Sequence, residues 1–209
     1  MCVPHWSVAS SGSFGSDRLT LPKVFLETPR ITLRRLMSSD VEELVELDSD
    51  PCVMRYLTGG EPHTRALLVE QFLPRMLDFY RRFDAFGFWA AIEIASGGFM
   101  GWFHFKPSDE NADDIELGYR LKRAYWDRGL ATEGSKALID EGFRELGVSK
   151  VVAETMASNV RSRRVLEKCG FLLERAFAYP GPPFPGWTPG DCMEVAYGLT
   201  RERWESLTS

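Results

Sequence analysis

The stretch from Tyr119 to Thr132 carries the residue types of an anion-binding turn. Apolar and polar residues alternate up to Leu121, as in a β-strand, and apolar residues recur at helical spacing from Leu130 onward. Gly129 stands where that helix would begin, and a helix start exposes unpaired backbone N–H groups at the positive end of the helix dipole. A phosphate group fits such a helix start, because glycine lets a ligand approach the backbone and the Thr132 hydroxyl adds a donor. The same residues also fit an ordinary strand, turn and helix without a ligand, and the turn alone does not separate the two.

The cysteine and histidine residues argue against a disulfide framework and against a metal site. The four cysteines form no Cys-x-x-Cys pair and the three histidines lie far apart, so we expect reduced cysteines in a cytoplasmic protein. His104, on an expected strand, fits a packed histidine better than a base. No apolar run reaches membrane-spanning length, and residues 1–16 lack the basic start and apolar run of a signal peptide. We therefore expect neither a signal peptide nor a membrane partner.

The charge is unevenly distributed along the chain. The net charge of the 209 residues is −5, yet the span 120–168 holds eleven Lys and Arg against seven Asp and Glu. This pattern predicts a basic seat for an anionic cofactor on an acidic body with little affinity for nucleic acid. Exposed helices that simply carry charge would give the same pattern, and the alternative stays open.

The remaining sequence predicts one mixed domain, residues 28–209, preceded by a loose Ser- and Gly-rich arm, residues 1–27. The length suits a single domain of two or three layers. A helix is expected over 41–47, and Asp50-Pro51 ends it. Another helix is expected over 64–83, and Pro74 should kink or split it. Further strands are expected at 31–36, 88–94, 99–105, 115–121, 151–153, 171–177 and 193–199, and further helices from Gly129 to a stop at Gly147 and at 159–168.

Several separated motifs occur in a fixed order along the chain. They are Pro29–Arg34 (PRITLR), Gly87–Ile92 (GFWAAI), Glu116–Tyr119 (ELGY), Tyr125–Glu133 (YWDRGLATE), Ala153–Thr155 (AET), and Asn159 and Ser162 followed by Arg164–Phe171 (RVLEKCGF). Together they resemble the GNAT superfamily of acyl-CoA N-acyltransferases, and within it the branch that includes ribosomal-protein N-terminal acetyltransferases. The resemblance runs from about Thr28 to Trp204. It implies an α+β fold of three layers, in which a mixed, mostly antiparallel central sheet carries helices on both faces.

The resemblance also implies how the chain would bind acetyl-CoA. The strand that ends at Tyr119 and Leu121 would diverge from its neighbour and pair through its backbone with the pantetheine arm. Asn159 would bind the pantetheine side, with Ser162 nearby. The pyrophosphate would lie against the turn formed by Asp127, Arg128, Gly129, Leu130, Ala131 and Thr132. The distal phosphate has Arg163, Arg164 and Lys168 as candidates, although solvation of a helix surface explains them equally well.

The chemistry implied by the resemblance is attack of a neutral amine on a thioester carbonyl, which a proton acceptor assists. Glu116 resembles the position from which this branch recruits a base through water, and a solvent-facing or core-edge Glu paired with Arg is an equal alternative. Many relatives carry Gly where Asp127 stands, so this carboxylate would lie beside the pyrophosphate. Many also carry a Tyr as general acid where Leu166 stands here, which leaves Ser162 as a conceivable donor to the thiolate.

We therefore expect an acetyl-CoA-dependent N-acetyltransferase that moves the acetyl group directly to a primary amine, either a protein N-terminus or a small amine. The acidic remainder of the chain favours a cationic acceptor, and the loop Pro180 to Gly190, with Phe184 and Trp187, would form part of the acceptor wall. A homodimer stays an open possibility. The alternatives are an acyl-CoA-binding sensor of the same fold without turnover, and an interaction module in which the turn binds no ligand.

Overall fold

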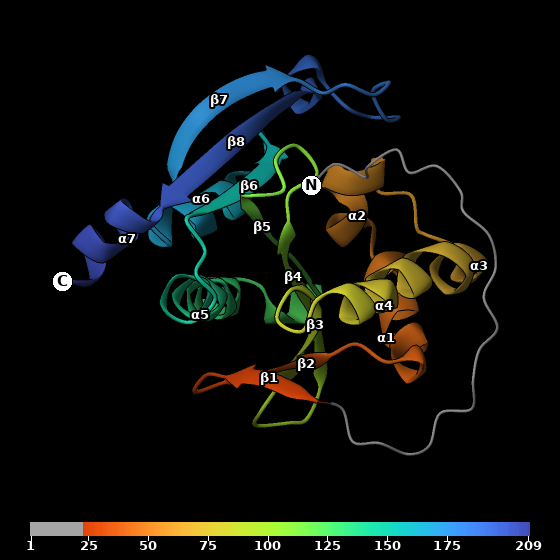
Figure 1. Ribbon diagram of the computed structural model, residues 1–209. Helices are drawn as coiled ribbons and strands as arrows, with labels where there is room; N and C mark the ends of the chain where they lie inside the picture. Colours follow the sequence, from red (N-terminus) through yellow and green to blue (C-terminus); the bar gives the residue numbers. More distant parts are fainter. Residues whose placement is uncertain (1–22) are drawn as a thin grey trace.

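The computed structural model describes residues 23–209, and its centre is an eight-stranded sheet in the order β1-β2-β3-β4-β5-β6-β8-β7 (Figure 1). Neighbouring strands pair antiparallel except β5 and β6, which pair in parallel. The sheet is thus mixed and mostly antiparallel, as expected. The strands are β1 Val24–Glu27, β2 Ile31–Arg35, β3 Gly87–Glu93, β4 Phe99–Pro107, β5 Ile115–Leu121, β6 Lys150–Met156, β7 Leu172–Ala178 and β8 Met193–Thr200.

Helices cover both faces of this sheet, so the expected three-layer α+β architecture is confirmed. One core packs α5 and α6 against β4, β5 and β6, and the second packs α1, α2 and α4 against the opposite face of β3 and β4. The helices are α1 Val41–Ser49, α2 Pro51–Thr58, α3 Arg65–Leu67, α4 Leu73–Arg82, α5 Leu130–Arg144, α6 Val160–Lys168 and α7 Arg201–Thr208. Short helical turns lie at Ser38–Asp40, Leu68–Phe72, Arg123–Tyr125 and Pro189–Cys192.

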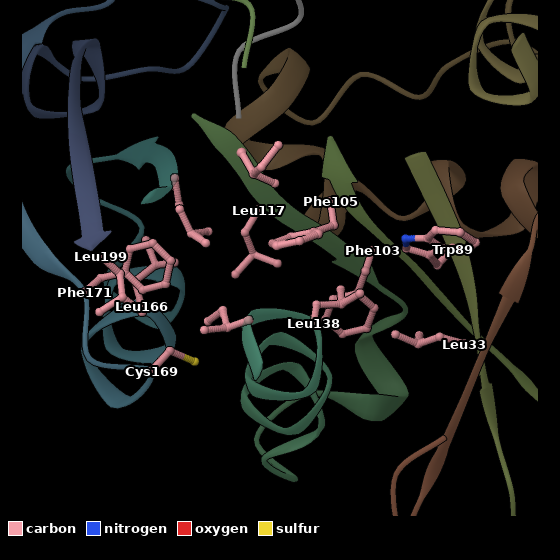
Figure 2. Close-up of a cluster of buried hydrophobic side chains, with 14 of the residues drawn as sticks. Leu33, Trp89, Phe103, Phe105, Leu117, Leu138, Leu166, Cys169, Phe171 and Leu199 are labelled. Carbon is pink, nitrogen blue, oxygen red and sulfur yellow. The ribbon is translucent and has the colours of Figure 1, made fainter. Parts of the chain in front are cut away.

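Two glycines allow α5 to lie close to the sheet. A Cβ at Gly134 would stand 2.5 Å from the ring of Phe103, and one at Gly142 would stand 2.5 Å from the ring of Phe105. Both rings are fully buried on β4, and Figure 2 shows them directed toward the helix that carries Leu138. The close packing fixes the axis of α5 and therefore the position of its first turn.

The structure corrects three details of the sequence prediction and confirms a fourth. Val24–Glu27 form β1, paired with β2, so the loose arm expected for residues 1–27 does not extend to these four residues; residues 1–22 of that arm lie outside the described residues. Pro51 ends α1, as expected, but it also begins α2. The helix expected over 64–83 is split, as Pro74 indicated, by a π-helical turn just before that proline. A last helix, α7, follows β8, which the strand pattern did not predict.

Candidate functional site

The sheet opens between β5 and β6. The two strands share only the pairs Ile115–Val151 and Glu116–Val152, while β5 continues to pair with β4 as far as Leu121 and β6 continues to pair with β8 as far as Met156. From Leu117 onward, β5 therefore has no paired β6 residue in the described chain. A strand edge of this kind offers backbone N–H and C=O groups to an extended ligand. The divergence expected at Tyr119 and Leu121 is present in the sheet.

Helix α5 begins at the far end of this opening. Gly129 precedes its first residue in the left-handed conformation, with φ 77°, which glycine adopts without steric cost. The N–H of Glu133 donates to the carbonyl of Gly129, so this is the first hydrogen bond of the helix. The preceding N–H groups, of Leu130, Ala131 and Thr132, belong to the first turn, in which backbone N–H groups have no carbonyl partner within the helix. These N–H groups lie at the positive end of a helix of 15 residues. The helix start expected at Gly129 is thus confirmed, and its binding of an anion stays a prediction.

A carboxylate of α5 and the β1–β2 hairpin hold this turn in place. The Glu133 carboxylate accepts bonds from the Thr28 hydroxyl (2.6 Å), the Arg30 N–H (3.0 Å) and the Arg30 guanidinium (2.6 Å). A second guanidinium nitrogen of Arg30 donates to the carbonyl of Arg128 at 3.0 Å. Burial alone would raise the pKa of Glu133, but the bonds from Thr28 and Arg30 outweigh it and lower the pKa. Glu133 and Arg30 stand in the motifs of the sequence analysis, but nothing in their spacing showed that they meet.

Two charged residues of the turn are paired with the protein rather than free. Asp127 adopts φ 55°, a left-handed conformation for which Gly is the preferred residue. Its carboxylate lies 3.6 Å from the guanidinium of Arg161, and both side chains are mostly exposed. The guanidinium of Arg128 bonds to Glu93 at 2.5 Å and lies over the ring of Tyr125. Arg161 rather than Arg128 therefore offsets the charge of Asp127.

Helix α6 meets β5 through two hydroxyl groups. The Asn159 side chain caps α6 by accepting the Ser162 N–H at 3.3 Å. The Tyr119 hydroxyl donates to the Ser162 hydroxyl at 3.2 Å, across the opening between β5 and α6. Burial raises the pKa of Tyr119, so this phenol stays protonated as a donor. Ser162 thus lies beside β5, whereas Leu166, at 2% exposure, lies in the core and carries no proton to donate.

Glu116 lies on the other face of β5, in a buried charged cluster. Its carboxylate contacts the Lys106 ammonium at 2.6 Å and the Nε2 of His104 at 3.3 Å, and both partners are almost fully buried on β4. Burial alone would raise the pKa of Glu116, but His104 and Lys106 outweigh it and hold the pKa well below its usual range. Burial lowers the pKa of His104 despite the carboxylate beside it. The carboxyl of Glu116 is therefore ionised at neutral pH.

A second buried charged cluster lies farther along the same face. Asp48 of α1 is 2% exposed. Both of its carboxylate oxygens accept from the Arg120 guanidinium of β5 at 2.6 Å, and one of them lies 2.8 Å from Nδ1 of His63. Burial alone would raise the pKa of Asp48, but Arg120 and His63 outweigh it and lower the pKa. The guanidinium of Arg120 also lies over the ring of Trp102. The sequence analysis did not single out these residues, because they are far apart in the chain.

The loop expected to wall the acceptor lies against α2. The indole N–H of Trp187 donates to the carbonyl of Arg55 at 3.2 Å, and Phe184 packs against Gly59, which ends α2. Phe184 and Trp187 also stack edge to face with ring centroids 4.9 Å apart. On the same helix, Tyr56 donates to the carbonyl of Ser158 at 3.4 Å. Helix α2 thus lies beside the end of β6, on the side of the sheet that carries Glu116.

The distal-phosphate candidates differ in their surroundings. Arg163 donates to the Tyr197 hydroxyl at 3.0 Å and to the carbonyl of Ala157 at 3.1 Å, so its guanidinium faces the protein. Arg164 and Lys168 stay predictions. Within residues 23–209, no group of three His, Cys, Asp or Glu residues is placed to hold a metal. None of the described helices combines the length and the apolar character needed to cross a membrane.

Comparisons with known proteins agree on one family. The model of an acetyltransferase (GNAT) domain matches residues 30–172. The chain is 35% identical over 190 residues to the FsC-acetyl coenzyme A-N(2)-transacetylase of Aspergillus fumigatus, which covers 86% of this chain and 77% of that protein. An acetyltransferase of the GNAT family from Bacillus anthracis has a TM-score of 0.66 at 24% identity, covering 87% of this chain and 98% of the other. The spermidine N-acetyltransferase from Vibrio cholerae, solved with CoA and spermine, has a TM-score of 0.66 at 16% identity, covering 85% and 99%.

Proposed function

Because this chain belongs to the GNAT family of acetyl-CoA-dependent N-acetyltransferases, we propose that it moves the acetyl group directly to a primary amine in a ternary complex. The single observation that supports this most strongly is the opening between β5 and β6, which leads to the first turn of α5. An extended ligand with an anionic end fits this arrangement, since the strand edge provides paired donors and acceptors and the helix start provides N–H groups.

In this proposal the backbone of Tyr119 and Leu121 pairs with the pantetheine arm. The pyrophosphate contacts the N–H groups from Gly129 to Thr132, which α5 and the Glu133 contacts hold in place. Asn159 and Ser162 bound the pantetheine from α6. This placement brings the thioester toward the pairs at which β5 and β6 still join, next to Glu116.

The thioester must be attacked by an amine that has lost a proton, and the thiolate must gain one. Glu116 stays ionised over the working pH range, because the pKa of its carboxyl is low. In this proposal Glu116 assists deprotonation of the acceptor through a water that its carboxylate binds. Ser162, bonded to Tyr119, donates a hydrogen bond toward the leaving sulfur.

The acceptor in this proposal is a cationic small amine rather than a neutral one. The relative named as a transacetylase acts on a nitrogen, N(2), of FsC, and the Vibrio cholerae structure contains spermine. The carboxylates Glu116 and Glu154 share the face on which α2 and the loop with Trp187 lie, and this acidic surface favours a cation. We propose that this loop forms part of the acceptor wall, and that the enzyme acts in the cytoplasm, as the free cysteines suggest.

Two measurements test the proposal. A panel of polyamines, amino sugars and peptides with free N-termini is incubated with acetyl-CoA, and both released thiol and acetylated product are measured by mass spectrometry. We expect faster thiol release with at least one amine than without protein, together with a mass increase of one acetyl group. A thermal unfolding titration with CoA provides the control, since a ligand at about 100 times its Kd adds roughly 2.7 kcal/mol of stability. Binding without release by any amine would instead support the sensor alternative.

A further inference from the structure

Glu154 of β6 lies next to the opening of the sheet, on the face that carries Glu116. Glu116 is the neighbour of Val152 where β5 and β6 still pair, and Glu154 stands two residues beyond Val152. Residues two apart on a strand point to the same face, so Glu116 and Glu154 share it. Glu154 is therefore the next residue of β6 on this face after β5 and β6 separate.

The surroundings of Glu154 differ from those of Glu116. Among residues 23–209, its ion pair is with Arg175 of β7 at 3.3 Å, and Arg175 makes a shorter contact of 2.5 Å with Glu110. Burial raises the pKa of Glu154, and the carboxylates of Glu110, Glu194 and Glu116 raise it further, while Arg175 acts in the opposite direction. Lys106 and His104 contact the carboxylate of Glu116, so they lower the pKa of Glu116 rather than that of Glu154. Two carboxyl groups on one face thus have pKa values moved in opposite directions, which is the usual arrangement of an acid–base pair.

We propose that Glu154 is a catalytic residue that accepts the proton of the acceptor ammonium, while Glu116 remains an ionised partner of Lys106. This inference rests on the proposed function. A base works best when its pKa lies near the operating pH. Burial and the neighbouring carboxylates raise the pKa of Glu154, whereas His104 and Lys106 lower that of Glu116. With a side chain 27% exposed, it also remains in reach of solvent.

The proton and bond changes balance as follows. The Glu154 carboxylate takes one proton from the ammonium, which leaves the nitrogen with a lone pair. That lone pair forms the N–C bond to the thioester carbonyl carbon, and the C–S bond then breaks with its electron pair on sulfur. The nitrogen loses its second proton to the thiolate, through water or the Ser162 hydroxyl, and the Glu154 carboxyl later releases its proton to solvent. The products are an amide, a thiol and one proton.

The test is the pH dependence of kcat/KM for one amine acceptor, since the acceptor contributes the same titration to every variant. We expect Glu154→Gln to lower kcat/KM at neutral pH about 100-fold or more and to abolish the acid limb that Glu154 provides. Glu110→Gln removes a neighbouring carboxylate, so the acid limb should move to lower pH. Arg175→Gln removes the cation, so the limb should move to higher pH. Both side chains are at least half exposed, so their removal leaves the fold intact.

Opposite shifts in these two surface variants would not follow from a merely structural role of Glu154. The Kd for CoA serves as the control and should stay within about twofold in Glu154→Gln, while Glu154→Asp should retain part of the activity. A kcat/KM of Glu154→Gln within threefold of the parent, or an acid limb unmoved in both surface variants, would overturn the assignment. If the parent enzyme acetylates no amine in the panel, the proposed function is wrong. A parent that is active and a Glu154→Gln variant with unchanged kcat/KM would instead refute only the role of Glu154.

Discussion

The contacts of Arg30 with α5 can be tested by a double-mutant cycle with Glu133. Arg30→Ala removes the guanidinium bonds to Glu133 and to the carbonyl of Arg128. Glu133→Gln removes only the charge that accepts the first of these bonds. A charge-assisted hydrogen bond contributes about 1.5–3 kcal/mol, and an exposed ion pair about 0.2–1 kcal/mol. The Arg30 side chain is 48% exposed and that of Glu133 is 17% exposed, so solvent screening places the coupling near 1 kcal/mol.

The same double-mutant cycle should also show a coupling between Arg30 and Glu133 in the Kd for CoA. Because Arg30 holds the carbonyl of Arg128 next to Gly129, its loss frees the turn that carries the N–H groups. A coupling of about 1 kcal/mol corresponds to roughly a fivefold change in Kd. Isothermal titration of CoA into the four proteins measures it, and urea unfolding measures the coupling in stability. Acetyl-pantetheine, which lacks the diphosphate, provides the control and should bind all four proteins alike.

The pH dependence of the stability coupling has a definite sign. The folded-state pKa of Glu133 is lowered, so its contribution is present above the unfolded pKa of about 4.5 and is lost as the pH falls through the folded pKa. The difference in unfolding free energy between the parent and Glu133→Gln should therefore shrink in acid. If the coupling in stability is below about 0.3 kcal/mol at pH 7, or if acetyl-pantetheine shows the same fivefold loss as CoA, the positioning argument is wrong.

The remaining predictions concern the turn, the buried cluster and the helix. Asp127→Gly should raise CoA affinity about two- to threefold at low salt and less at high salt, because it removes a screened negative charge near the proposed diphosphate position. Titration of CoA at two ionic strengths measures this, and equal or weaker binding by the variant would refute it. Glu116→Gln should lower turnover and cost roughly 3 kcal/mol, because it leaves the Lys106 ammonium buried without its main partner. Adding Lys106→Met should restore the melting temperature but not the turnover, and recovery of both would make Glu116 structural. Gly134→Ala should cost about 1–3 kcal/mol because the new methyl group meets the Phe103 ring; calorimetry that shows an unchanged Tm would contradict the packing argument.

Local signals in the sequence predicted much of the site. Gly129 and Gly147 mark the limits of α5 because left-handed positions favour glycine, and Asn159 marks the start of α6 because its side chain caps a helix. The expectation that relatives carry Gly at position 127 also has its physical reason in the structure, since Asp127 occupies a left-handed conformation. These features depend on a few neighbouring residues, and a single sequence contains them.

Features formed by residues distant in the chain were not predictable in this way. The Glu133 carboxylate meets Thr28 and Arg30 across about one hundred residues, and no local pattern indicates such a contact. One of the two equal alternatives for Glu116 paired it with Arg, whereas its partner is Lys106, because β4 and β5 pair in a register that sets the two residues opposite each other. Assigning the charge state of a candidate base therefore required the register.

The order of the last three strands in the sheet has a consequence for folding. β8 lies between β6 and β7, although β7 comes first in the chain, so neither β6 nor β7 can complete its hydrogen bonding on that side until Met193–Thr200 arrives. Until then, β6 exposes an unpaired edge on the side away from the opening, and β7 has no partner in the sheet. During synthesis β6, which bounds the opening, would therefore become rigid late, and a ribosome-bound chain that stops before Met193 should present these two edges to chaperones or to other chains.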